Sequence, residues 1–150
     1  MIEYINKTIP IQKKEAYFGN REYKIYLNNE TGENIKYKIK KNKSNEFIDT
    51  LKNVKNISKL NKRASQLRFR LEEGNGKALY MIGVSDSGKT DGIDIKTIYT
   101  SIHYLENMVK IINAEIKTIR IYKGKCDGKY ICCSRIDIPN YIHNQIPDIE

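Results

Sequence analysis

Residues 83–90 are the part of the chain whose residue types and spacing most directly suggest chemistry. They read Gly-Val-Ser-Asp-Ser-Gly-Lys-Thr, so Gly83, Gly88, Lys89 and Thr90 occupy every required position of a nucleotide-binding P-loop. In a working P-loop the backbone N–H groups surround the phosphates, and the Lys-Thr pair begins a helix whose N-terminus faces them. The pattern makes a small P-loop NTPase one hypothesis for this chain.

The residues that follow the motif favour a different interpretation. Thr90 is followed by Asp91-Gly92-Ile93-Asp94; the two carboxylates would repel phosphates, and the glycine would interrupt a helix. The sequence also lacks a later apolar strand that ends in a magnesium-binding Asp, and an Asn-Lys-x-Asp motif for reading a base. The run Asp86-Ser87-Gly88 therefore predicts a tight turn that joins two antiparallel strands, with Gly88 at positive φ.

The histidines and cysteines do not have the spacing of a metal or catalytic site. His103 and His143 have no cysteine or carboxylate partner at ligand spacing. Cys132 and Cys133 are neighbours on a predicted strand, so they point to opposite faces. With Cys126 they make three cysteines, an odd number that is typical of reduced thiols. We therefore expect no metal, no cofactor in this chain, and a cytoplasmic, reducing location.

The chain is strongly basic: it carries 27 Lys and Arg against 18 Asp and Glu in 150 residues, a net charge of +9. This charge favours an anionic partner such as RNA, tRNA or the ribosome. The alternative is a composition effect, because an A/T-rich genome encodes proteins rich in Lys, Asn, Ile and Tyr. The 39% of hydrophobic residues is typical of a globular domain. No apolar run approaches the ~20 residues of a membrane span, so we expect no membrane contact.

Hydrophobic spacing predicts the elements of the first half of the chain. Residues 1–20 mix apolar and polar residues without a period, and we interpret them as an N-terminal arm. Alternation over 23–27 and 35–39 predicts a β-hairpin. Residues 45–73 change to a helical period and end at Gly74, which we expect at positive φ. The apolar face of this helix consists of Leu60, Ala64, Leu67 and Leu71.

The second half continues with a strand, a helix and a hairpin. The nearly continuous apolar run 77–84 predicts a central strand, and a short return strand to Ile93 follows the turn. Asp94 is a suitable N-cap for a second helix, which Asn113 can end in the left-handed conformation. A final hairpin is expected from strands at 116–121 and 130–136.

These elements predict an α+β fold, in which two helices pack on an antiparallel-rich sheet in the order β-β-α-β-β-α-β-β. A chain of this length forms one ordinary domain. We therefore divide the sequence into an N-terminal arm at 1–20, a single α+β domain at 21–138, and a linker at 139–150.

The first helix also has a cationic stripe beside its apolar face. This stripe consists of Lys59, Lys62, Arg63 and Arg70. Arginine is scarce in the chain, so two arginines on one stripe are less easily attributed to codon usage. We predict that the stripe contacts phosphates of RNA or an acidic partner; the alternative is an ordinary solvated helix face. Phe69 lies outside the apolar face, and it either packs against a neighbouring element or stacks on a base.

Residues 66–88 carry a resemblance to a known family. They read QLRFRLEEGNGKALYMIGVSDSG, which is similar to the pattern Q-L-x-x-R-L-x-E-G-x-G-x-A-x-Y-x-I-G-V-x-D-x-G. That pattern precedes the GTPase domain in the GTP-binding protein 1 and 2 family, which are translational GTPases similar to elongation factor 1-alpha. The resemblance covers residues 35–138, with residues 45–56 as an insertion.

The resemblance implies that the chain is a non-catalytic accessory domain that positions a GTPase on RNA, the ribosome or a protein partner. GTP and Mg²⁺ would then bind to a downstream GTPase domain in cis, and the P-loop pattern at 83–90 would be accidental. Two alternatives stay open beside it. One is a stand-alone RNA-binding or interaction module, since the Gly-Val-x-Asp-x-Gly turn after a strand also resembles Schlafen-type AlbA domains. The other is the small P-loop NTPase.

Overall fold

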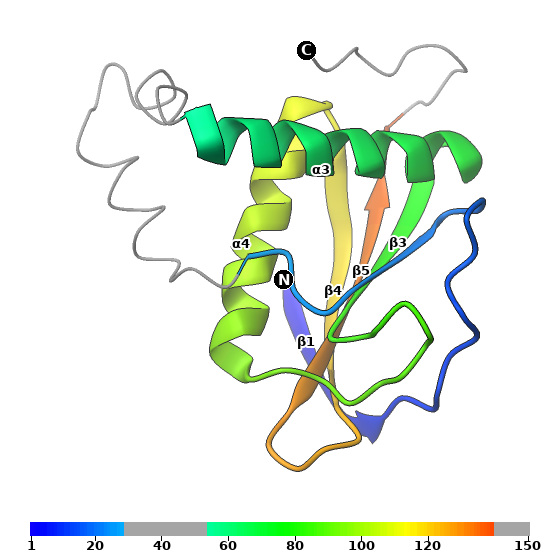
Figure 1. Cartoon of the computed structure of the whole chain (residues 1–150), viewed down its shortest axis with the longest axis vertical. Helices are drawn as coiled ribbons and strands as arrows, with labels where there is room; N and C mark the ends of the chain where they lie inside the picture. The colour runs from blue at the N-terminus through cyan, green and yellow to red at the C-terminus, as the bar shows by residue number, and fades with distance from the viewer. Residues whose placement is uncertain (29–53, 140–150) are drawn as a thin grey trace.

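The computed structural model describes residues 1–28 and 54–139 of the chain (Figure 1). It contains two helices and five strands, which confirms the predicted α+β class. The elements in chain order are β1 (Ile2–Thr8), β2 (Arg21–Lys24), α3 (Val54–Glu73), β3 (Lys77–Ile82), α4 (Ile95–Ile111), β4 (Glu115–Lys123) and β5 (Tyr130–Asp137).

The five strands form one mixed sheet in the order β1-β4-β5-β3-β2. β5 is antiparallel to both β3 and β4. The two outer pairings, β1 with β4 and β2 with β3, are parallel. The final hairpin is confirmed, since β4 and β5 are adjacent antiparallel strands. The sheet is nonetheless less antiparallel than expected, because both edge strands pair with strands that are distant in the sequence.

The margins of the sheet differ from two of the sequence predictions. The expected arm contributes β1, so part of it belongs to the sheet. β2 pairs in parallel with β3. The second half of the predicted hairpin, 35–39, lies outside the described residues, so that hairpin stays a prediction. The expected return strand to Ile93 is wrong, because Ile93 forms only an isolated bridge with Tyr130.

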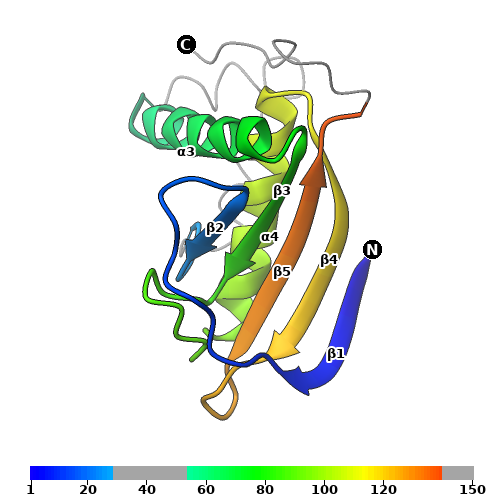
Figure 2. The ribbon, with the colours of Figure 1, turned by 90° about the vertical axis from the view of Figure 1, so that its right-hand side faces the viewer.

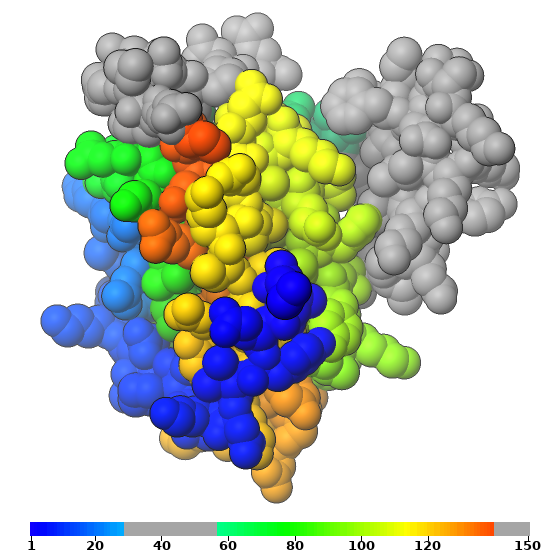
Figure 3. All heavy atoms as spheres, turned by 180° about the vertical axis from the view of Figure 1, so that it is seen from behind, coloured from blue at the N-terminus to red at the C-terminus, as the bar shows by residue number. Residues whose placement is uncertain are grey.

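Both helices lie on one face of the sheet, and α3 runs across one end of α4 (Figures 1 and 2). The main core lies between the helices and the strands. Its strand residues alternate along each strand, as in Tyr80 and Ile82 of β3 and Ile119 and Ile121 of β4. The opposite face bears no helix of the described part, and side chains of β1, β4 and β5 form the surface there (Figure 3).

Helix α3 buries the predicted face, since Ala64, Leu67 and Leu71 have no exposed surface. Its end differs from the prediction by one residue: the left-handed residue is Asn75, at φ 53°, and not Gly74. Gly74 is needed for a different reason. A Cβ there would lie 1.9 Å from the Lys77 carbonyl oxygen, so only glycine allows the chain to turn back into β3 at this point.

Helix α4 begins and ends as the sequence predicts. Asp94 occupies the N-cap position in an extended conformation, without a side-chain cap hydrogen bond. Asn113 is left-handed, at φ 55°. Neither α3 nor α4 is long and apolar enough to cross a bilayer.

Candidate nucleic-acid interface

The P-loop-like residues form the predicted tight turn with Gly88 at positive φ, although the segment that follows it makes only an isolated bridge and not the expected second strand. The Gly88 N–H donates to the Ser85 carbonyl at 2.9 Å, and Gly88 has a φ of 91°. The Lys89 N–H donates to the Ser85 hydroxyl at 3.2 Å. These two amides are therefore bonded within the loop, and the next helix begins only at Ile95. A P-loop needs both free amides and an immediate helix, so this geometry does not favour phosphate binding at the loop.

The turn is instead packed under the N-terminal segment. The Gln12 N–H donates to the Gly88 carbonyl at 2.8 Å. Thr90 is buried, and its hydroxyl donates to the Ile9 carbonyl at 3.1 Å. Gly83 is in close contact with β5, where a Cβ would lie 2.8 Å from the Tyr130 carbonyl oxygen. Gly88 and Thr90 of the P-loop pattern are thus hydrogen-bonded to the N-terminal segment, and Gly83 packs against β5.

Arg70 is not part of an exposed stripe, and that prediction is wrong. Its side chain is buried, and its Nε donates to Glu22 Oε1 at 2.9 Å. Its two terminal nitrogens donate to the carbonyls of Ala16, Tyr17 and Gly19 at 3.1, 3.3 and 2.9 Å. Arg70 therefore fixes residues 16–19 and β2 against α3, and its donors are used within the fold.

Of the other three stripe residues, only the two lysines remain exposed on one side of the helix. Arg63 turns toward α4, where its guanidinium lies 5.9 Å from the centroid of the Tyr104 ring. Lys62 is exposed and faces β2. Lys59 is also exposed and lies one turn before Lys62 on the same side of the helix. The predicted stripe is thus reduced to two exposed lysines on α3.

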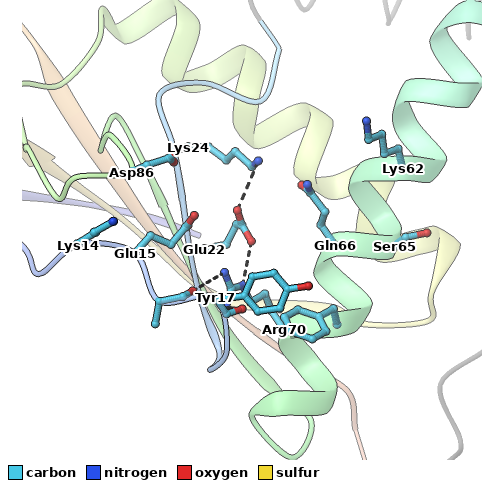
Figure 4. Close-up of a pocket in the computed structure, with 12 residues that line it drawn as sticks. Lys14, Glu15, Tyr17, Glu22, Lys24, Lys62, Ser65, Gln66, Arg70 and Asp86 are labelled. Atoms are coloured by element: carbon cyan, nitrogen blue, oxygen red, sulfur yellow. Dashed lines mark hydrogen bonds and ion pairs between the residues drawn. The ribbon is translucent and has the colours of Figure 1, made fainter.

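Lys62 belongs to a cleft of about 710 Å³ between α3, β2 and the N-terminal segment. Figure 4 shows Lys24, Lys62 and Gln66 extending into the same space from β2 and α3. Lys14 lines the cleft from the N-terminal segment. Cations from three separate segments therefore meet around one hollow. Helical spacing in the sequence predicts only the α3 residue of this cleft, because Lys14 and Lys24 have no distinguishing pattern in the sequence.

Three carboxylates line the same cleft: Glu22, which is buried, Glu15, which is half-buried, and Asp86, which is exposed. Glu22 is buried between Arg70 and Lys24, whose Nζ is 3.4 Å from Glu22 Oε2, so its charge is compensated (Figure 4). Burial raises the pKa of Glu15, and the nearby Glu22 and Asp86 raise it further, although the Tyr23 N–H donates to this carboxylate and acts in the opposite direction. The cleft thus has an acidic side at Glu15 and Asp86 and a cationic side formed by α3 and β2.

Two aromatic rings, Tyr17 and Phe69, line the cleft, and a third, Phe18, packs beside them. Tyr17 and Phe18 are 79% and 65% exposed, with ring centroids 4.8 Å apart and an interplanar angle of 82°. Phe69 of α3 packs beside them, at 6.2 Å from Tyr17 and 6.4 Å from Phe18. We call Tyr17, Phe18 and Phe69 the aromatic ridge. Phe69 does pack against a neighbouring segment, but the irregular pattern of residues 1–20 gives no sign of the two exposed rings that it contacts.

The thiols and histidines do not form a site in the described residues. No three His, Cys, Asp or Glu side chains there are grouped as ligands of a metal ion. Burial raises the pKa of Cys132 to about 11 and that of Cys133 to about 12, so both remain protonated at neutral pH. His103 lies 3.5 Å from Glu106, one turn along α4. His143 lies outside the described residues.

Comparison with known proteins gives a weak and partial similarity. The chain is 29% identical over 111 residues to GTP-binding protein 2 of Mus musculus and of Homo sapiens. It is 28% identical over 102 residues to an uncharacterized protein of Acanthamoeba polyphaga mimivirus. The matches cover 74% and 67% of this chain, but 14% of GTP-binding protein 2 and 54% of the viral protein. No family model and no solved structure matches the chain. The similarity indicates a domain related to a segment of GTP-binding protein 2.

Proposed function

We propose that this chain is a non-catalytic accessory domain of a translational GTPase, and that it contacts the phosphate backbone of RNA along the cationic side of the cleft. The observation that carries the RNA contact is that Lys24 of β2 and Lys62 of α3 extend into one hollow (Figure 4). Phosphate contacts need cations placed at intervals along a surface, without base-specific geometry. Lys59 extends that surface by one further turn of α3.

The similarity to a segment of GTP-binding protein 2 supports the accessory role, because the matched segment is a small part of that protein. GTP and Mg²⁺ would then bind to a separate GTPase domain, and the residues described here would position it. The packing of the turn at residues 83–90 under the N-terminal segment supports the same division of roles. It also disfavours the small P-loop NTPase.

The test measures RNA binding and its dependence on salt. Fluorescence anisotropy with a labelled RNA of mixed sequence would be recorded over a range of KCl concentrations, for the wild type and for Lys59→Gln/Lys62→Gln. Neutral glutamine removes two charges without adding repulsion. The slope of log affinity against log salt should become shallower by about 0.7 for each phosphate of a single strand that is no longer neutralised. The affinity should fall for all sequences alike, because backbone contacts carry no base information.

The matched control is Lys125→Gln/Lys129→Gln. Both lysines are exposed in the β4–β5 loop, at the opposite end of the sheet from α3, so the net charge changes equally (Figure 1). The control should retain the wild-type salt slope. An equal weakening in the two double variants would refute the proposal, since the binding would then reflect net charge alone. A stand-alone RNA-binding module would give the same result, and fusion to a GTPase domain would distinguish it.

A further inference from the structure

We infer that the aromatic ridge is a base-stacking platform, and that the nucleic acid bound beside it is single-stranded. The inference rests on the proposed RNA contact and specifies the kind of RNA. Tyr17 and Phe18 are the reason to look for a ligand here, because they expose 79% and 65% of their surface in a segment that is bonded to the body of the domain. Exposed aromatic side chains that adjoin a cleft are a mark of a binding surface.

The ridge is held in place by the fold and is not a loose loop. Arg70 donates hydrogen bonds to the carbonyls of Ala16, Tyr17 and Gly19. The Gly19 N–H donates to Glu73 Oε1 at 3.0 Å, which fastens the same segment to the end of α3. The backbone on either side of the two exposed rings is therefore bonded. A fixed backbone reduces the ordering cost of binding, since the rings are already presented.

The arrangement of the rings leaves faces available for a ligand. Tyr17 and Phe18 meet nearly edge to face, at 82°, and Phe69 is tilted by 60° and 46° to them. The three rings therefore do not form a closed stack of their own. The Arg70 guanidinium lies 5.5 Å from the Phe69 centroid, so one ring already has a cation beside it. Tyr17 and Phe18 are the rings left for an incoming planar group.

The charged residues of the cleft indicate which kind of planar group would stack on the ridge. Tyr17 and Phe69 line the same cleft as Lys62, and Glu15 and Asp86 lie on its other side. A ligand that stacks on the ridge therefore has a cation beside it on α3. An aromatic surface beside a cation matches a nucleotide strand, whose bases stack while its phosphates are neutralised. A duplex keeps its base faces inside its own stack, so it can use the lysines but not the ridge. Single-stranded RNA uses both.

The experiment compares two probes and three double variants of the full chain. The probes are a labelled single-stranded RNA and the same RNA annealed to its complement. We expect the wild type to bind the single strand more tightly. Tyr17→Ala/Phe18→Ala should weaken single-strand binding by roughly five- to 150-fold for each base that no longer stacks. Duplex binding should change by less than about twofold, since the duplex does not use the ridge. Tyr17→Trp/Phe18→Trp should keep the wild-type preference for single-stranded over duplex RNA, because Trp retains a stacking face.

The matched control is Tyr4→Ala/Tyr99→Ala, which removes two other exposed aromatics at the β1 side of the molecule. It should leave both affinities unchanged. The inference is overturned if Tyr17→Ala/Phe18→Ala binds the single strand as the wild type does, or if both probes weaken together. A ridge that serves a protein partner would give the first of these results. If Lys59→Gln/Lys62→Gln changes nothing for either probe, the proposed function fails as well.

Discussion

Arg70 offers the sharpest test of how this domain is held together. The change is Arg70→Met, which keeps much of the length of the side chain and removes its charge and donors. It leaves Glu22, 6% exposed, with Lys24 as its remaining cation at 3.4 Å. It also leaves three backbone carbonyls without their present donor. Removing one partner of a buried ion pair typically costs about 3–5 kcal/mol. Because Lys24 still compensates Glu22, we expect the lower end, about 3 kcal/mol.

The assay is thermal unfolding followed by circular dichroism. A destabilisation of about 3 kcal/mol should lower Tm by roughly 6–12 °C in a chain of this size. The matched control is Arg68→Met on the same helix, where the Arg68–Glu72 pair is 3.6 Å apart and far more exposed. A surface pair contributes at most about 1 kcal/mol. If Arg70→Met is no more destabilising than Arg68→Met, our account of Arg70 as the residue that fixes the N-terminal segment is wrong.

A double-variant cycle separates the ion pair from the other Arg70 contacts. Glu22→Gln combined with Arg70→Met removes both charges at once. We expect the double variant to be less destabilised than the sum of the two single changes, because neither charge is then left buried without its partner. Additive effects would mean that the backbone carbonyls, and not Glu22, account for the stability that Arg70 provides.

Two further predictions concern the same N-terminal segment. Gly88→Ala should destabilise the fold by more than about 2 kcal/mol, whereas Gly19→Ala should cost about 1 kcal/mol, by chemical denaturation. Both glycines have positive φ, but only at Gly88 would a Cβ meet backbone, 2.1 Å from the Gln12 carbonyl oxygen; equal costs would contradict this packing. For Glu15, a pKa raised above 4.5 means that the folded state holds the proton more tightly than the unfolded state. Stability relative to Glu15→Gln should therefore fall as pH rises from 4.5 through the folded pKa to neutrality. A constant difference over that window would show that the pKa is not raised.

Several parts of this fold follow from local physics and can be predicted from sequence. The period of Leu60, Ala64, Leu67 and Leu71 predicts the buried face of α3, because residues three and four apart share one side of a helix. The left-handed Asn113 and the turn at Gly88 are also predictable, since both follow from the backbone preferences of single residues.

Strand pairing is much less visible in the sequence. β1 lies in residues with an irregular polar pattern, and it is recognisable only through its parallel pairing with β4, about a hundred residues further along the chain. β2 likewise pairs with a strand that is distant in the sequence, since the whole of α3 lies between β2 and β3 in the chain. Hydrogen bonds between strands use backbone groups that every residue carries, so sequence patterns say little about which strands will meet.

The cleft and its rim depend on how distant segments pack. Arg70 and Glu22 are 48 positions apart, and helical spacing places Arg70 only at the edge of the apolar face. Whether an arginine at such an edge contacts solvent or a carboxylate depends on what packs over it. Here residues 16–19 and β2 pack over it, and this burial turns an expected RNA contact into an internal ion pair. The same packing brings Tyr17 to the cleft that Lys62 lines, because contacts between distant segments depend on the shape of the whole core and not on any one stretch of sequence.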